Sequence, residues 1–132
     1  MLELAISAGV MVTCLGGTFQ FGYTFYVYNQ LVSAVGDGAR YASVRPMSGD
    51  LQSDKTAIRN MVVYGESKPG PTAIPVVRNL TPEQVEVEYV QDGAAVRVAI
   101  QNYKVDAIFG EFEFTGRPGV EFPYVGPPAG SR

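Results

Sequence analysis

The chain has no histidine and only one cysteine among its 132 residues, and both shortages narrow the range of functions. Without histidine, the chain lacks the usual general base and the commonest metal ligand. Cys14 cannot form a disulfide within the chain, and its apolar surroundings favour a small core residue. Charged residues make up 17% of the chain, with a net charge of −3 and no basic run. This composition argues against nucleic acid as a partner.

Motifs that would carry chemistry are also missing. Glu111 and Glu113 alternate with phenylalanines, so both carboxylates fall on the outer face of an expected strand as solvated charges. Asp50 and Asp54 lack the ligand spacing of a calcium-binding loop. No nucleophile has an identifiable base, and no glycine loop of the phosphate-binding type occurs. We therefore expect no enzyme, no catalytic residue, no cofactor and no metal.

Charge is also absent from residues 4–36, between Glu3 and Asp37. A helix needs roughly 20 mostly apolar residues to cross a bilayer, so this segment is long enough to do so. It is too long for the apolar region of a signal peptide, has no positive segment before it, and is followed by no evident cleavage site. We expect residues 1–45 to form a hydrophobic helix and residues 46–132 to form one small head.

The orientation of this helix follows from the charges that flank it. Arg40 and Arg45 would place the head in the cytoplasm under the positive-inside rule. A basic leader removed before Met1 would reverse that orientation and give a secreted head.

Small residues recur at every fourth position near the N-terminus, and they define a small-residue ladder. The ladder would lie along one face of a helix and let another helix backbone approach closely. Because small residues are abundant in apolar helices, chance is the alternative. The ladder consists of Ala5, Gly9, Thr13 and Gly17.

Aromatic residues follow the glycines on two neighbouring helical faces. They suit a membrane–water interface, where a ring lies in apolar surroundings and a hydroxyl in water. They suit packing between helices of a polymer equally well, whereas an electron-conducting stack is the remote alternative. They are Phe19, Tyr23 and Tyr26 on one face and Phe21, Phe25 and Tyr28 on the other.

The head begins after polar residues and a proline that end the first helix. A second, short helix is predicted over residues 53–64, with Asp50 or Ser53 as its N-cap and Gly65 as its stop. Its inner stripe is expected to consist of Ala57, Met61 and Tyr64.

A β-hairpin is predicted over residues 84–103, around the Asp92-Gly93 turn. Both faces of the hairpin are then chemically matched, which a shift of one residue would destroy. Residues 74–77 and 112–114 are weaker strand candidates, and the last seven residues favour a loose tail. The fold class is therefore α+β, with a long hydrophobic helix, a short helix and a small antiparallel sheet. The predicted pairs are Tyr89 with Val96, Val87 with Val98, Val85 with Ile100 and Glu88 with Arg97.

Short runs in both helices carry a family resemblance. They are Gln20-Phe21-Gly22, Tyr26-Val27-Tyr28-Asn29-Gln30-Leu31, Gly38-Ala39-Arg40-Tyr41-Ala42 and Ile58-Arg59-Asn60-Met61-Val62-Val63-Tyr64-Gly65. Over residues 3–65 the chain resembles the TadE-like pilins, relatives of type IV pilins that are tied to tight-adherence pili.

The resemblance implies a leader cleaved by a prepilin peptidase, extraction from the membrane, and assembly into a helical filament. It implies that Glu3 meets the N-terminal amine of a neighbouring subunit, since a buried charge is costly until it is paired. From the residues alone, Glu3 could instead lie at the lipid headgroups or help to start the helix. The resemblance also implies copies of the chain, the membrane and the pilus assembly machinery as partners.

Three hypotheses about function remain open at this point. The chain is a structural subunit that moves from the cytoplasmic membrane to an extracellular type IV pilus-like filament. Alternatively, it is a minor subunit that stays in the membrane and primes assembly, or a single-span anchored module that binds a surface.

Overall fold

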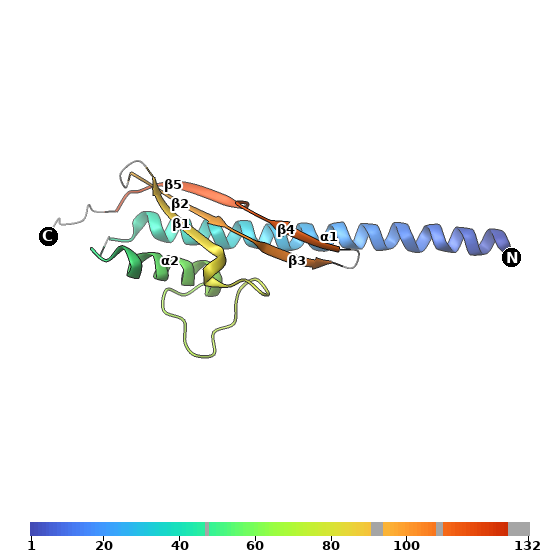
Figure 1. Ribbon diagram of the computed structural model, residues 1–132, viewed down its shortest axis with the longest axis horizontal. Helices are drawn as coiled ribbons and strands as arrows, with labels where there is room; N and C mark the ends of the chain where they lie inside the picture. The colour runs from blue at the N-terminus through green and yellow to red at the C-terminus, as the bar shows by residue number, and fades with distance from the viewer. Residues whose placement is uncertain (47, 91–93, 108–109, 127–132) are drawn as a thin grey trace.

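A computed structural model describes residues 1–46, 48–90, 94–107 and 110–126 (Figure 1). The chain is α+β, as predicted. Its elements are α1 (Leu2–Val44), α2 (Leu51–Tyr64), a 3-10 turn η1 (Pro82–Gln84), β1 (Val85–Val90), β2 (Ala95–Ile100), β3 (Tyr103–Ala107), β4 (Gly110–Phe114) and β5 (Gly119–Pro123).

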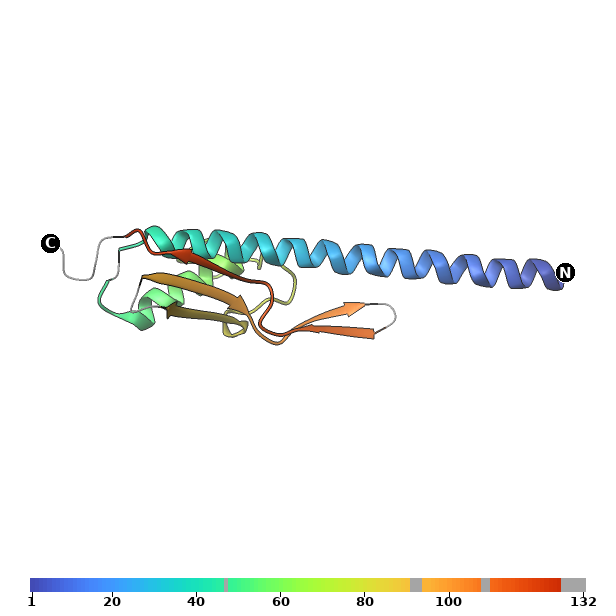
Figure 2. The same cartoon turned by 90° about the horizontal axis from the view of Figure 1, so that it is seen from above.

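Helix α1 runs the length of the molecule, and the head packs on its C-terminal half (Figure 2). The helix ends at Val44 because Arg45 precedes Pro46, and a residue before proline is pushed out of the helical region. Arg45 is accordingly extended, with φ −74° and ψ 131°. The first helix therefore ends one residue before the predicted position.

The face of α1 that the head covers is made mostly of small or β-branched residues. Gly38 lies where α1 crosses α2, and a Cβ atom placed there would overlap the side chain of Val62. Glycine thus permits the close approach of the two helices. The buried residues of α1 are Gln20, Val27, Leu31, Ala34, Val35, Gly38, Ala39, Ala42 and Ser43.

Helix α2 begins and ends at capping residues that the sequence predicts. The Asp50 side chain accepts a hydrogen bond of 3.1 Å from the backbone N–H of Gln52, so Asp50 and not Ser53 is the N-cap. Gly65 ends the helix with φ 73°, a left-handed conformation that glycine adopts without strain.

The inner face of α2 was only partly predicted. Ala57 is buried as expected, but Met61 and Tyr64 are only half-buried. The stripe lies to one side of them because α2 packs on α1 and on the sheet at once, and it contains a carboxylate. The buried residues are Asp54, Ala57, Ile58, Val62 and Val63.

The main sheet has the strand order β1-β2-β5, and all its pairs are antiparallel. The register between β1 and β2 is the predicted one, whereas the Asp92-Gly93 turn lies outside the described residues. One face of this hairpin joins the core, where Val85, Val96, Val98 and Ile100 are fully buried. The confirmed pairs are Tyr89 with Val96, Val87 with Val98, Val85 with Ile100 and Glu88 with Arg97.

A two-stranded ribbon of β3 and β4 extends the head alongside α1 towards the N-terminus (Figures 1 and 2). We call it the β3–β4 arm, residues 103–107 and 110–114. The predicted strand at residues 112–114 lies within β4, and Tyr103 pairs with Phe114 across the arm.

One strand prediction fails, and one strand was not predicted. Residues 74–77 form no strand, since Pro75 cannot donate a ladder hydrogen bond. Only Val77 of that stretch is buried, and Ile74 is 82% exposed. Strand β5 was missed, because its flanking glycine and prolines read as chain-breaking residues. Most of the predicted tail, residues 127–132, lies outside the described part of the chain.

Candidate functional site

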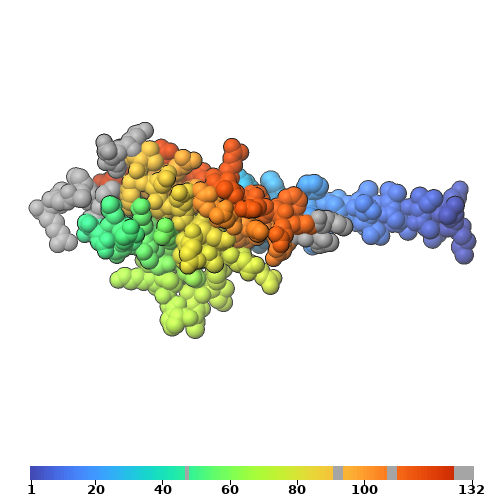
Figure 3. All heavy atoms as spheres, viewed as in Figure 1, coloured from blue at the N-terminus to red at the C-terminus, as the bar shows by residue number. Residues whose placement is uncertain are grey.

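The N-terminal half of α1 projects beyond the head as a bare apolar helix (Figure 3). No residue in 2–19, a stretch that the structure describes in full, is buried. The helix is long and apolar enough to cross a membrane, and none of its most apolar 18-residue window is buried. Large side chains exposed by 60% or more include Leu2, Leu4, Ile6, Val10, Met11, Val12 and Leu15.

The small-residue ladder lies on this bare helix and faces open space. A Cβ atom placed at Gly9 or Gly17 would meet nothing within 4 Å. The Thr13 hydroxyl donates to the Gly9 carbonyl oxygen at 2.9 Å, so it needs no partner from another molecule. The i+3 step from Gly17 to Gln20 makes the ladder continuous with the face that the head covers. Whether a second helix packs on the ladder stays a prediction.

Glu3 lies in the first turn of α1 and is exposed. A carboxylate in the first turn stabilises the helix, because it interacts favourably with the positive end of the helix dipole. Among the described residues, Glu3 forms no ion pair within the chain. Its pairing with a neighbouring subunit stays a prediction.

The aromatic residues lie where the bare helix meets the head, and they do not all share one environment. Tyr28 turns towards the head, with its ring centroid 5.5 Å from that of Phe114 in β4. We call the others the outward rings because each is at least 40% exposed, although Tyr23 and Tyr26 also line a pocket beside Tyr103 of β3. The Tyr26 hydroxyl accepts a hydrogen bond of 2.7 Å from Gln30. The outward rings are Phe19 (65% exposed), Phe21 (74%), Tyr23 (40%), Phe25 (68%) and Tyr26 (59%).

A buried ion pair joins the end of α1 to α2, and the sequence interpretation missed it. The Arg45 guanidinium lies 3.3 Å from the Asp54 carboxylate, whose side chain is 2% exposed. The backbone N–H and hydroxyl of Ser48 donate to the same carboxylate at 3.0 and 2.7 Å. Arg45 also donates to the Tyr41 hydroxyl at 2.9 Å. We call this group the Arg45–Asp54 latch; a carboxylate one turn into a helix was its only sequence signal.

Two tyrosines of the head have perturbed titration. Burial raises the pKa of Tyr103 above its ordinary value of 10.0, and nearby Tyr23 and Asp106 raise it further. Burial also raises the pKa of Tyr89, with the Asp54 carboxylate as the next contribution. Both side chains are therefore protonated at neutral pH. The Tyr103 hydroxyl donates to the Arg78 carbonyl oxygen at 2.7 Å.

Comparisons with known proteins bear on the same helix. Residues 1–40 match a family model described as TadE-like protein. No curated protein and no solved structure matches the chain significantly. The resemblance to the TadE-like family that the sequence predicts is thus confirmed over residues 1–40, which include the bare helix and most of the buried face of α1. Together with the apolar helix, this match fits a pilus-related subunit.

Proposed function

We propose that this protein is a structural pilus subunit that polymerises through α1 into an extracellular type IV pilus-like filament. The observation that carries the proposal is the bare apolar helix within the segment that matches the TadE-like family. Water is a poor solvent for such a surface, because exposed apolar area favours removal from water. A lipid bilayer or copies of the same helix would cover it.

These two environments correspond to two stages. The subunit first resides in the cytoplasmic membrane, where α1 spans the bilayer and the head lies outside it. A prepilin peptidase removes a basic leader, and the assembly machinery extracts the subunit. In the filament, the α1 helices of neighbouring copies cover one another, and the heads form the outer surface.

The outward aromatic rings and the ladder would then take part in helix packing. A fibre needs each subunit to offer two different surfaces, because contacts that do not close generate open helical assemblies. The bare half of α1 offers one such surface, and the exposed polar face of its second half offers another.

Electron microscopy of filaments sheared from cells, combined with mass spectrometry of their main band, tests this function. We expect this chain to be the main component, with residues 1–35 buried against copies of themselves. A strain that lacks the gene, complemented with the wild-type gene, provides the control.

The same experiment separates the alternatives. Recovery of the chain only in the membrane fraction, with filaments made of another protein, would identify a priming subunit. A chain that remains monomeric in detergent-free solution would contradict polymerisation.

A further inference from the structure

We propose that, before assembly, the head rests directly on the bilayer surface, with the β3–β4 arm at the lipid headgroups as a stop that sets how far α1 inserts. This inference rests on the membrane stage of the proposed function and adds a lipid-contacting surface on the head. The surface consists of the arm and the outward aromatic rings of α1.

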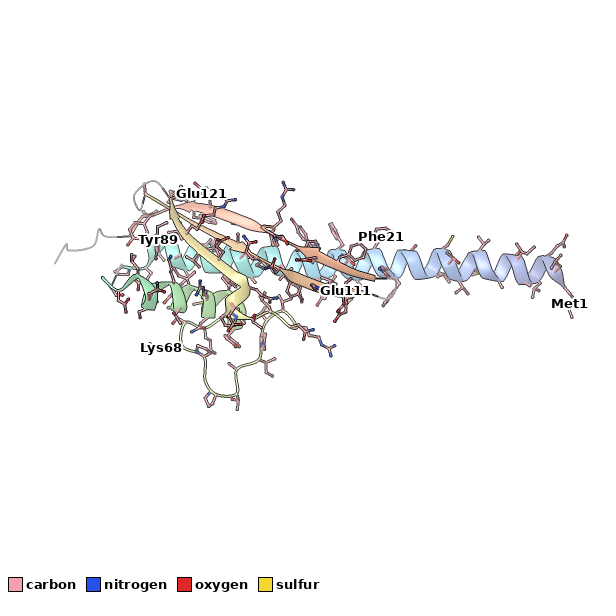
Figure 4. The ribbon with its side chains drawn as sticks, viewed as in Figure 1. Met1, Phe21, Lys68, Tyr89, Glu111 and Glu121 are labelled. Carbon is pink, nitrogen blue, oxygen red and sulfur yellow. The ribbon has the colours of Figure 1, made fainter. Side chains whose placement is uncertain are left out.

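The length of α1 beyond the arm is the first reason. In Figure 4, Glu111 on the arm lies near the level of Phe21 along the helix axis. Residues 2–19 therefore project past the arm, and at 1.5 Å per residue they span roughly 27 Å. The hydrocarbon core of a bilayer is about 30 Å thick. The bare helix is thus about 3 Å shorter than the core, so its length nearly matches the core at the point where the arm reaches the surface.

The second reason is that the arm cannot follow the helix into the hydrocarbon. It is a ribbon of only two strands, so its outer edges carry backbone groups without a ladder partner among the described residues. Such open edges are not tolerated in lipid. The arm also carries exposed charges, which are costly inside a bilayer. They are Lys104, Asp106, Glu111 and Glu113.

The third reason is that the arm is fixed to α1 at a defined level. Phe114 of β4 contacts Tyr28 of α1, and Tyr103 and Val105 of β3 are buried in the head. The Tyr103 hydroxyl ties β3 to the loop at Arg78. A stop works only if it does not slide along the helix, and these contacts prevent sliding.

The fourth reason is the kind of side chain at this level. Aromatic rings are enriched at membrane–water interfaces. Phe19, Phe21, Phe25 and Tyr26 on α1 are all more than half exposed, and Phe112 on the arm is 43% exposed. A lipid interface is therefore the occupant that suits both the rings and the neighbouring charges.

The absence of tryptophan from the chain makes a direct test possible, because one introduced tryptophan reports one position. Full-length single-tryptophan variants are placed in phosphatidylcholine vesicles that contain lipids brominated either near the headgroup or near the bilayer centre. Phe112→Trp should show emission shifted to shorter wavelength and quenching mainly by the shallow bromines. Val125→Trp, at the opposite end of the head, should show quenching by neither.

A third position separates failure of this inference from failure of the proposed anchor. Val10→Trp should be quenched mainly by the deep bromines. Deep quenching of Val10→Trp without lipid quenching of Phe112→Trp would overturn only the proposed contact between the head and the bilayer surface. If Val10→Trp also escapes quenching, α1 does not insert. Both the proposed membrane anchor and the proposed contact of the head with the bilayer are then wrong. Emission of Phe112→Trp that is shifted but unquenched would mean that another copy covers the arm, which also overturns the proposal.

The role of the arm as a stop has its own test. In the Phe112→Trp background, Glu111→Leu combined with Glu113→Leu removes two charges from the arm. The quenching of Trp emission should then shift from the shallow towards the deep bromines. Glu121→Leu, which removes a charge from β5 far from the arm, should leave the depth unchanged. An unchanged depth in the arm variant would show that the charges do not set the insertion level.

Discussion

The two halves of α1 belong to one continuous helix, yet they meet different surroundings. The N-terminal half carries large apolar side chains all around, and none of them is buried. The C-terminal half is amphipathic, with small apolar residues on the buried face and Asn29, Ser33, Asp37 and Arg40 exposed. A helix that is apolar all round belongs in lipid or among other helices, whereas an amphipathic helix packs on a core. The distribution of side chains around the helix, more than hydrophobicity itself, distinguishes its two partners.

The largest expected effect concerns the bare half. If Glu3 pairs with the amine of a neighbour, Glu3→Ala should lower filament yield strongly while membrane insertion remains intact. An uncompensated buried charge costs roughly 3–5 kcal/mol, enough to shift a polymerisation equilibrium. Filament mass from sheared cells, normalised to subunit in the membrane fraction, measures the effect. Ser7→Ala is the matched control, and a normal yield from Glu3→Ala would count against the pairing.

The next largest effect concerns the C-terminal half of α1, on which the head packs. Asp54→Ala removes the carboxylate of the Arg45–Asp54 latch and should destabilise the head by about 3 kcal/mol, near the low end for a buried pair because Arg45 reaches solvent. Denaturant unfolding of the full chain in detergent measures this change. Lys104→Ala breaks the exposed pair with Glu111 and should cost less than about 1 kcal/mol. Equal effects of the two substitutions would refute a structural role for the latch.

A reciprocal pair of substitutions sharpens the comparison further. Gly38→Leu overlaps Val62 and should destabilise the head by about 1–3 kcal/mol or more, without impairing insertion of the bare half. Gly9→Leu should leave the head stable but yield few filaments, because overpacking in a helix contact costs about 1–3 kcal/mol at every subunit.

The measurements for this pair are denaturant unfolding and filament counts on both variants. Gly22→Ala, off the ladder and with nothing within 4 Å, should assemble more nearly normally. Wild-type filament numbers from Gly9→Leu would show that the ladder is an accident of composition. The aromatic faces would then be the next candidates for packing.

The smallest expected effect is on the stability of the head at alkaline pH. The raised pKa of Tyr103 means that the folded head holds this proton more tightly than the unfolded chain does. Its contribution to stability is complete below pH 10.0 and is lost as pH rises through the higher folded value. Tyr103→Phe should lower stability at pH 7 by about 0.5–1.5 kcal/mol, through loss of the hydrogen bond to Arg78, yet reduce the loss above pH 10. An unchanged alkaline slope in unfolding experiments would contradict this assignment.

Local chemistry made part of this fold predictable from sequence. The β1–β2 register follows from matched residues on both faces of one hairpin, and a slip by one position would have exposed the valines. The caps of α2 follow from the residue types that satisfy free backbone groups at helix ends. The uncharged run likewise predicts the bare helix without reference to the rest of the chain.

Features that depend on distant partners were not predictable in this way. From the sequence, Asp54 is expected to be a solvated surface charge. Only the packing of α1 on α2 buries it and brings Arg45 within 3.3 Å. Strand β5 joins the sheet beside β2 rather than beside its neighbour in sequence. The alternation of Val120 and Phe122 with Glu121 is its sequence signal, although Pro118 and Pro123 at its ends are residues typical of chain breaks.

The absence of buried residues before Gln20 in α1 has a practical consequence for handling the protein. Removing residues 1–19 deletes no buried side chain from this stretch, which the structure describes completely, and leaves every α1 residue of the core in place. A fragment that begins at Gln20 would therefore fold without detergent and suit crystallisation or antibody production. Residues 1–19 could also be replaced by a coiled-coil helix. The number of helices in that coiled coil would then set how many heads are displayed together.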